Sequence, residues 1–159
     1  MSVAFTKESD LEATAADLPD RPISPHPNLV TAEGMAALDE ALAQARAAYA
    51  AAQTSGDVQG DRTAMARATR DLRYYAARRA SARLTEGGSE PGVVGFGSRV
   101  VLDREDGRRQ SFRIVGEDEA DPKAGSVSYV SPLARALMGR RAGEVVQLSG
   151  AEIEIVAVD

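Results

Sequence analysis

Arginine side chains are concentrated between residues 61 and 84, where seven arginines stand against only Asp61 and Asp71. The whole chain of 159 residues is acidic, with a net charge of −5, so this basic segment requires an explanation. A guanidinium group binds phosphate through paired hydrogen bonds, and a row of them attracts RNA or an acidic protein wall. The alternative is a solvated helix face, but like charges without acids four residues away destabilise an isolated helix. We therefore expect RNA or acidic-wall contacts at Arg62, Arg67, Arg70 and Arg73.

Composition excludes several other kinds of chemistry. The chain has no cysteine, which excludes disulfides, thiolate zinc sites and thiol nucleophiles. Its one histidine, His26, stands between two prolines and is expected to be a solvated loop residue, so no nucleophile–base pair of an independent enzyme is visible. The acidic net charge argues against a protein that simply coats DNA. No apolar run has the length of a membrane span or the pattern of a signal peptide, so we expect a cytoplasmic protein without a membrane partner.

Two long helices are predicted to carry the basic segment, after a flexible acidic leader at residues 1–27. Thr31 is expected to be the N-cap of the first helix, and Ser55–Asp57 is expected to end it. The second helix is expected to start near Asp61 or Thr63 and to run to about residue 84. Apolar residues at spacings of three and four predict a heptad seam: Met35, Leu38, Leu42, Ala45, Tyr49 and Ala52, then Met65, Ala68, Leu72, Tyr75 and Ala82, interrupted by Arg79. Residues 28–86 are therefore interpreted as an antiparallel coiled-coil hairpin, roughly 35 Å long. Two helices of a small bundle are the alternative, but no third helix of matching length is predicted.

A small α+β domain is predicted at residues 93–159, after a glycine-rich linker at residues 87–92. Alternating apolar and polar residues indicate strands at 99–103, 126–130, 145–148 and 153–158, with a hairpin turn at Asp106–Gly107. Ser131 is expected to cap a short helix that begins at Pro132 and stops at Gly139. The predicted fold class is α+β, with an N-terminal helical hairpin.

Two stretches of this domain closely resemble the GreA and GreB transcription elongation factors. They are residues 115–121, which read VGEDEAD, and residues 131–139, which read SPLARALMG. Residues 4–8 (AFTKE) and 28–31 (NLVT), with Gly34 and Leu38, are similar to GreB in particular. The likeness runs in order from residue 28 to residue 158. It implies a coiled-coil hairpin followed by an FKBP-like C-terminal domain, an arrangement that the periodicity indicates independently.

The resemblance also implies a partner and a function. Members of the family bind RNA polymerase at its secondary channel, and the hairpin reaches the nascent RNA 3′ end of a backtracked complex. The expected protein is a monomer that is not itself an enzyme but modulates the intrinsic RNA cleavage activity of the polymerase. The arginines would then contact RNA or the channel wall. The residues expected to bind polymerase are those of the two matching stretches: Asp118, Glu119, Ala120, Asp121, Ser131, Pro132, Leu133 and Ala134.

The hairpin tip departs from the family pattern, which reads Gly-Asp-Leu-x-Glu-Asn-Ala-Glu and uses two acids to help hold a second magnesium ion. Residues 56–62 read GDVQGDR, so Asp57 matches the first acid, whereas Gly60 replaces the second and Asp61 follows it. The resemblance implies that Asp57 and Asp61 assist catalysis by sharing Mg²⁺ with the polymerase active site, with no cofactor bound by the protein alone. The alternative is that Asp57 closes a turn and Asp61 only caps the second helix.

Three functions stay open at this point. The first is an elongation factor that modulates cleavage of backtracked RNA, and the second is a non-cleaving regulator that competes with other factors for the channel. The third is a peptidyl-prolyl isomerase, because the C-terminal domain resembles FKBP folds. Such isomerases use a proline pocket lined by aromatic side chains, whereas residues 93–159 contain only Phe96, Phe112 and Tyr129. A fold alone does not confer the activity.

Overall fold

The computed structural model describes residues 18–54, 58–87 and 90–159, without the side chains of residues 58–61. The chain divides into two compact units. The helical unit consists of Met1–Pro25 and Leu38–Ser81, and the globular unit consists of His26–Ala37 and Ala82–Asp159. No helix within the described residues is long and apolar enough to span a membrane.

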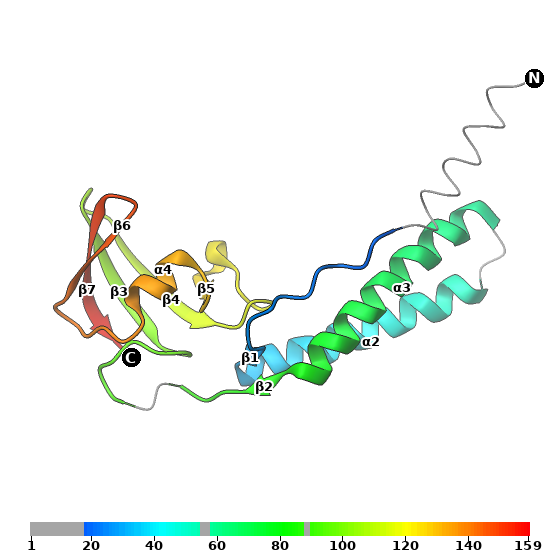
Figure 1. Ribbon diagram of the computed structural model, residues 1–159, viewed down its shortest axis with the longest axis horizontal. Coiled ribbons are helices and arrows are strands. Elements are labelled where there is room, and N and C mark those ends of the chain that lie inside the picture. Colours follow the sequence, from blue (N-terminus) through cyan, green and yellow to red (C-terminus); the bar gives the residue numbers. More distant parts are fainter. Residues whose placement is uncertain (1–17, 55–57, 88–89) are drawn as a thin grey trace, which may run out of the picture. The chain divides into compact units, whose positions relative to one another are not determined.

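Two long helices, α2 (Ala32–Thr54) and α3 (Val58–Ser81), lie side by side and run in opposite directions (Figure 1). From Leu38 onward α2 belongs to the helical unit, whereas its first residues belong to the globular unit. Leu38, Leu42 and Ala45 of α2 are buried, as is Ala68 of α3. These are seam positions, so the predicted helical hairpin is confirmed. With 23 residues, α2 is about 35 Å long.

Arg79, which interrupts the predicted seam of α3, is held by an ion pair across the hairpin. Its Nε lies 2.5 Å from Oδ1 of Asp39 on α2. Both side chains keep partial access to solvent, so the guanidinium is neither buried nor unpaired. A charged residue can therefore stand at a seam position without breaking the packing of the two helices.

Both ends of α3 differ from the prediction. The helix begins at Val58, three residues before Asp61, so Asp61 lies inside the helix and is not its N-cap. The glycine at position 60 is included because one helical glycine costs only about 1 kcal/mol relative to alanine. The helix ends at Ser81 rather than near residue 84, because the following residues form β2 (Arg83–Leu84). This strand pairs in parallel with β1 (Leu29–Val30), a pairing that the sequence analysis missed.

The globular unit is built on a five-stranded sheet in the order β5-β4-β3-β7-β6. Its strands are β3 (Arg99–Arg104), β4 (Arg109–Val115), β5 (Ser126–Ser128), β6 (Val145–Leu148) and β7 (Ala151–Val158). Neighbouring strands are antiparallel except for β4 and β5, which are parallel. A 3-10 turn, η1 (Pro122–Ala124), precedes β5, and the short helix α4 (Pro132–Leu137) follows it. The predicted α+β class is confirmed.

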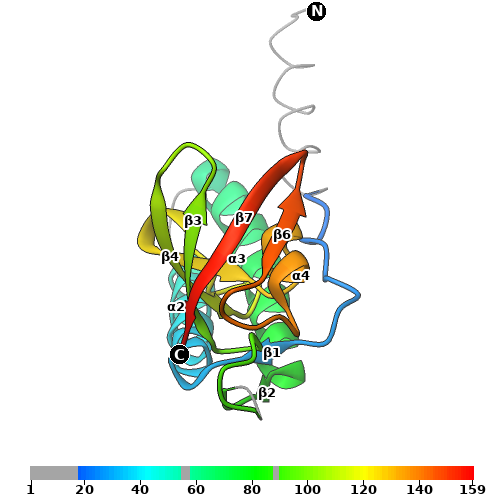
Figure 2. The ribbon, with the colours of Figure 1, turned by 90° about the vertical axis from the view of Figure 1, so that its left-hand side faces the viewer.

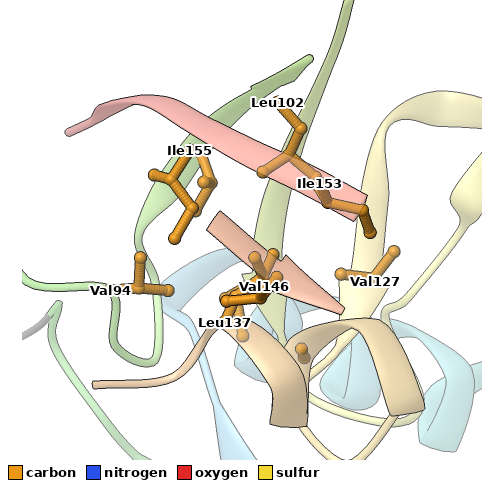
Figure 3. Packing of buried hydrophobic residues seen from close by; sticks show 10 residues of the cluster. Val94, Leu102, Val127, Leu137, Val146, Ile153 and Ile155 are labelled. Atoms are coloured by element: carbon orange, nitrogen blue, oxygen red, sulfur yellow. The ribbon is translucent and has the colours of Figure 1, made fainter. Parts of the chain in front are cut away.

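One face of this sheet carries the hydrophobic core. Figure 2 shows β7 between β3 and β6, and Figure 3 shows the apolar side chains that gather between the sheet and α4. The alternation predicted for β3 is correct, since Val100 and Leu102 are fully buried. Ile153 and Ile155 of β7 and Leu137 of α4 are buried in the same cluster. The core of the globular unit is thus supplied by residues between Val94 and Ile155.

Candidate functional site

The two stretches expected to bind polymerase meet at one end of the sheet. Because β4 and β5 are parallel, their carboxyl ends lie at the same edge, and the backbone N–H of Tyr129 donates to Val115 O at 2.9 Å. Gly116–Asp121, which we term the docking loop after the polymerase contact expected of it, leaves the end of β4 there. Ser131, at the start of α4, follows the end of β5 within three residues. The structure thereby brings together residues that are ten or more positions apart in sequence.

Within the docking loop, Asp118 and Asp121 are exposed, whereas Ala120 is half-buried. Asp121 caps η1, since its side chain accepts from the Lys123 N–H at 3.2 Å. Its own backbone N–H donates to Ser126 Oγ at 2.8 Å. These bonds fix the loop while leaving two carboxylates at the surface, where a cationic partner surface can reach them.

Glu119 has an intramolecular role that the sequence analysis did not predict. Its carboxylate accepts two hydrogen bonds from Thr31, one from the backbone N–H to Oε2 at 3.1 Å and one from the hydroxyl to Oε1 at 2.5 Å. Thr31 Oγ1 in turn accepts from the Gly34 N–H at 3.0 Å, which confirms Thr31 as the N-cap of α2. The sequence held no local signal for this contact, because Gly34 at the third position after the N-cap shows only that a local capping box is absent.

The second matching stretch begins with a helix cap, as predicted. Ser131 Oγ accepts from the Ala134 N–H at 3.2 Å, and Pro132 occupies the first turn of α4. Pro132 is exposed and Leu133 is half-buried, so both remain accessible to a partner. Ala134 is fully buried in the core. Its methyl group packs on the buried face of this short helix, and the polymerase contact expected at Ala134 stays a prediction.

A residue in the first turn of α2 forms an ion pair with a residue of the sheet. Arg113 Nη1 of β4 lies 3.5 Å from Glu33 Oε2. The pKa of the Glu33 carboxyl is held below its usual range, first by a hydrogen bond from its own backbone N–H and then by the charge of Arg113. Since Glu33 stands at the amino end of α2, its negative charge also suits the helix dipole.

The predicted arginine contacts on α3 are not equivalent. Arg62, Arg67 and Arg73 are exposed, whereas Arg70 is half-buried and has its Nε 3.7 Å from Asp71 Oδ1. Within the described part of the chain, no ion pair engages Arg67. The basic character predicted for α3 is thus present at its surface, with Arg67 the most available of the predicted contacts for a phosphate.

Residues of the expected flexible leader contact α3, which sequence reasoning missed. The Arg21 guanidinium lies over the Tyr74 ring and forms an ion pair with Asp71 at 3.3 Å. The pKa of Arg21 is raised, chiefly by a hydrogen bond with Tyr75. Asp20 forms an ion pair with Arg73, also at 3.3 Å. The leader cannot be treated as uniformly solvated up to residue 27, because Asp20 and Arg21 make specific side-chain contacts.

The tip acids are only partly covered by the structure. Asp57 lies outside the described residues, and Asp61 lies in the first turns of α3, without a described side chain. Among residues 18–54, 58–87 and 90–159, no three His, Cys, Asp or Glu side chains are grouped as ligands for a metal ion. The joint magnesium role of Asp57 and Asp61 stays a prediction.

Comparison with known proteins shows which protein family this chain is related to. The family model for "Transcription elongation factor, GreA/GreB, C-term" matches residues 89–159. GreA of Phenylobacterium zucineum is 35% identical over 136 residues, which cover 76% of this chain and 87% of that protein. This chain belongs to the GreA/GreB family of transcription elongation factors. This match covers far more of the chain than residues 89–159, so membership does not rest on the C-terminal domain alone.

Similarity within the GreA/GreB family is strongest over shorter segments. GreA of Thioalkalivibrio sulfidiphilus is 47% identical over 72 residues, but this match spans only about half of each protein, 42% of this chain and 46% of the relative. Among solved structures, GreA factor homolog 1 (Gfh1) of Thermus thermophilus is 26% identical and covers 84% of this chain and 99% of its own, with a TM-score of 0.39.

Proposed function

We propose that this GreA/GreB family protein binds RNA polymerase at the secondary channel and modulates cleavage of backtracked RNA. The observation that carries the proposal is the exposed basic surface of α3, on a two-helix hairpin in a member of this family. Arg62 and Arg67 would contact the phosphates of RNA or acidic groups of a channel wall, whereas Arg73 already pairs with Asp20. The nascent RNA 3′ end would then lie near the hairpin tip.

The globular unit would supply the docking surface. Asp118 and Asp121 present carboxylates next to the start of α4, and Pro132 adds an exposed apolar contact. A small acidic and apolar surface of this kind suits a basic, partly apolar partner surface. Its residues are held by β4, β5 and η1, so little conformational freedom would be lost on binding.

At the tip, Asp57 and Asp61 would offer carboxylate oxygens to a Mg²⁺ ion shared with the polymerase. Magnesium usually keeps several waters and takes one or two protein carboxylates, so two donated acids can complete a site that another protein begins. A second metal in a nuclease site stabilises the attacking and leaving oxygens. The protein would act through the polymerase and would not be a catalyst by itself.

A non-cleaving channel regulator is the second candidate, and Gly60 favours it. This glycine lies within α3 at the position where the family pattern has its second acid. A peptidyl-prolyl isomerase is disfavoured, because all three aromatic side chains of the domain, Phe96, Phe112 and Tyr129, are engaged in packing. Phe96 is buried edge-on to Tyr129, and the Tyr129 hydroxyl donates to Pro27 O at 2.5 Å.

An RNA-cleavage assay on a purified, backtracked polymerase complex tests the proposal. Labelled transcript would be followed with and without the protein, at several Mg²⁺ concentrations. If the protein raises the release of 3′ fragments above the intrinsic rate, it is a cleavage factor. If it instead lowers the release that a known cleavage factor produces, it is a non-cleaving competitor. Absence of binding to polymerase in the same preparation would reject both.

A further inference from the structure

The start of α2 is capped from a distant part of the chain. In a capping box, the third residue after the N-cap is Glu or Gln, and its side chain accepts from the backbone N–H of the N-cap residue. Here the N-cap is Thr31 and the third residue is Gly34, which has no side chain to return the bond. Glu119 of the docking loop accepts from the Thr31 N–H instead, at 3.1 Å, and also from the Thr31 hydroxyl, at 2.5 Å.

Two glycines make this approach possible. A Cβ atom on Gly34 would lie 1.9 Å from Glu119 Oε2, a distance that no real contact allows. A Cβ atom on Gly116, at the start of the docking loop, would lie 2.3 Å from Leu29 O. Neither glycine has a positive φ, so backbone conformation does not require glycine at either position. The close approach of the loop to the start of α2 supplies the reason for both.

The same loop therefore has two faces. One face presents Asp118 and Asp121 to solvent, at the surface proposed to dock on polymerase. The other face holds Thr31, which with Gly34 begins a helix that continues without interruption to Thr54. A carboxylate at a helix amino end is favoured by the helix dipole and by unpaired N–H groups, which makes Glu119 suited to this contact.

We infer that Glu119 is a positioning residue that joins the docking loop to the first turn of α2. Its carboxylate fixes where the hairpin begins with respect to the loop, so a partner that binds the loop also orients the start of the hairpin. This assigns Glu119 a role inside the chain in place of the polymerase contact expected from the family resemblance. The consequence for RNA cleavage rests on the proposed function, whereas the capping contact can be measured on the protein alone.

Hydrogen exchange of the full-length protein tests the contact. Glu119→Ala should raise the exchange rate of the Thr31 amide by about tenfold or more, since a hydrogen bond to a charged group is lost. Gly34→Ala should have the same effect, because the added methyl displaces the carboxylate. Gly87→Ala is the matched control, since a Cβ atom there would meet nothing within 4 Å. Unchanged exchange at Thr31 in the first two variants would overturn the inference.

Moving the carboxylate from the loop to the helix separates positioning from simple helix capping. The double variant Gly34→Glu with Glu119→Ala places a glutamate at the third helical residue, where it can close a local capping box. The space is available because the atoms closest to a Gly34 Cβ all belong to Glu119. We expect this variant to regain slow exchange at Thr31 but to lack the link between the loop and the helix.

The cleavage assay then supplies the decisive comparison. Positioning predicts that Glu119→Ala and the double variant both change the effect on RNA cleavage by on the order of tenfold to a hundredfold, while polymerase affinity stays within about twofold. Full activity of the double variant would show that capping alone suffices and would overturn the inference. An equal loss of polymerase affinity and of activity would mean that Glu119 contacts polymerase directly, which would overturn the inference as well. If the unaltered protein has no effect on polymerase, the proposed function fails, but the exchange results still decide the contact.

Discussion

The Arg21 guanidinium lies 3.9 Å from the centroid of the Tyr74 ring. A cation over an aromatic face at this distance contributes about 0.5–1 kcal/mol at an exposed site, and the ion pair with Asp71 adds to it. The contact holds the preceding residue, Asp20, next to Arg73 of α3. Asp20 and Arg21 therefore occupy part of the basic surface proposed to contact RNA.

Asp20→Asn should increase the salt dependence of binding to single-stranded RNA or to a backtracked complex. Without the carboxylate, Arg73 becomes available for a phosphate, and each added phosphate contact steepens the slope of log K against log salt by about 0.7 for a single strand. Dissociation constants measured between low and moderate KCl concentrations would give the slope. Glu152→Gln, which removes an exposed acid from β7, is the charge-matched control. An equal slope for Asp20→Asn and the wild-type protein would exclude competition by the leader.

Arg67→Gln should reduce the effect on long backtracked RNA more than Arg70→Gln does. Arg67 is exposed, whereas Arg70 is half-buried beside Asp71 and is less able to reach a phosphate. The loss of one phosphate contact should also flatten the slope of log K against log salt by about 0.7 on single-stranded RNA. The assay compares cleavage of long backtracked RNA with binding to free polymerase. Equal losses in both measurements would mean that Arg67 touches protein only.

The local signals in the sequence predicted those parts of the fold that depend on neighbouring residues. Ser131 followed by Pro132 is such a signal, because both the cap and the fixed proline φ act within one turn. The heptad seam is another, and the burial of Leu38 and Leu42 follows from it. Asp106–Gly107 also forms the predicted turn, with Gly107 at a φ of 85°.

Contacts between distant residues could not be predicted in the same way. The bonds from Arg83 N–H to Asn28 O and from Thr85 N–H to Val30 O end α3 early, but the two segments lie more than fifty positions apart. The contact between Glu119 and Thr31 is equally non-local. The family resemblance implied a polymerase contact for Glu119, whereas the structure shows its contact with Thr31 inside the chain.

Asp118→Asn together with Asp121→Asn should weaken docking on polymerase without disturbing the loop. Asparagine can still cap η1, since its side-chain oxygen accepts as the Asp121 carboxylate does. Each exposed charge contributes up to about 1 kcal/mol, or about fivefold in Kd, when it faces an opposite charge. Competition against a labelled wild-type protein for free polymerase measures the loss. Unchanged competition, with Glu152→Gln as the control, would place the docking surface elsewhere.

Ile153→Ala should lower the free energy of unfolding by about 2–5 kcal/mol, because it leaves a cavity in the core of the globular unit. Ile153 is fully buried, whereas Ile23 is 50% exposed and lies outside that core. Ile23→Ala is therefore the matched control, with an expected change within about 0.5 kcal/mol. Urea denaturation monitored by circular dichroism gives both values. Similar destabilisation by the two substitutions would contradict the assignment of the core.

Substitutions at the hairpin tip distinguish a cleavage factor from a non-cleaving competitor. We expect the unaltered protein to give weak, magnesium-dependent stimulation, because Gly60 stands where the family pattern has its second acid. Asp57→Asn should abolish this stimulation while polymerase binding is kept, since the amide has the size of the acid but not its charge. Gly60→Glu should raise stimulation by restoring a carboxylate at that position. Each variant would be assayed for cleavage of backtracked RNA and for competition on free polymerase.

Gly60→Gln is the control that separates charge from helix stability. Gly60 lies in the first turn of α3, so any good helix former there should stabilise the helix by about 0.5–1 kcal/mol relative to glycine. Glutamine provides this gain without a carboxylate, and it should leave magnesium-dependent stimulation unchanged. Equal stimulation by Gly60→Gln and Gly60→Glu would mean that a firmer tip, rather than a metal ligand, had been missing. Inhibition of cleavage by the unaltered protein, or no effect of Asp57→Asn, would instead make the non-cleaving competitor the better account, because Asp57 would then have no part in holding the metal.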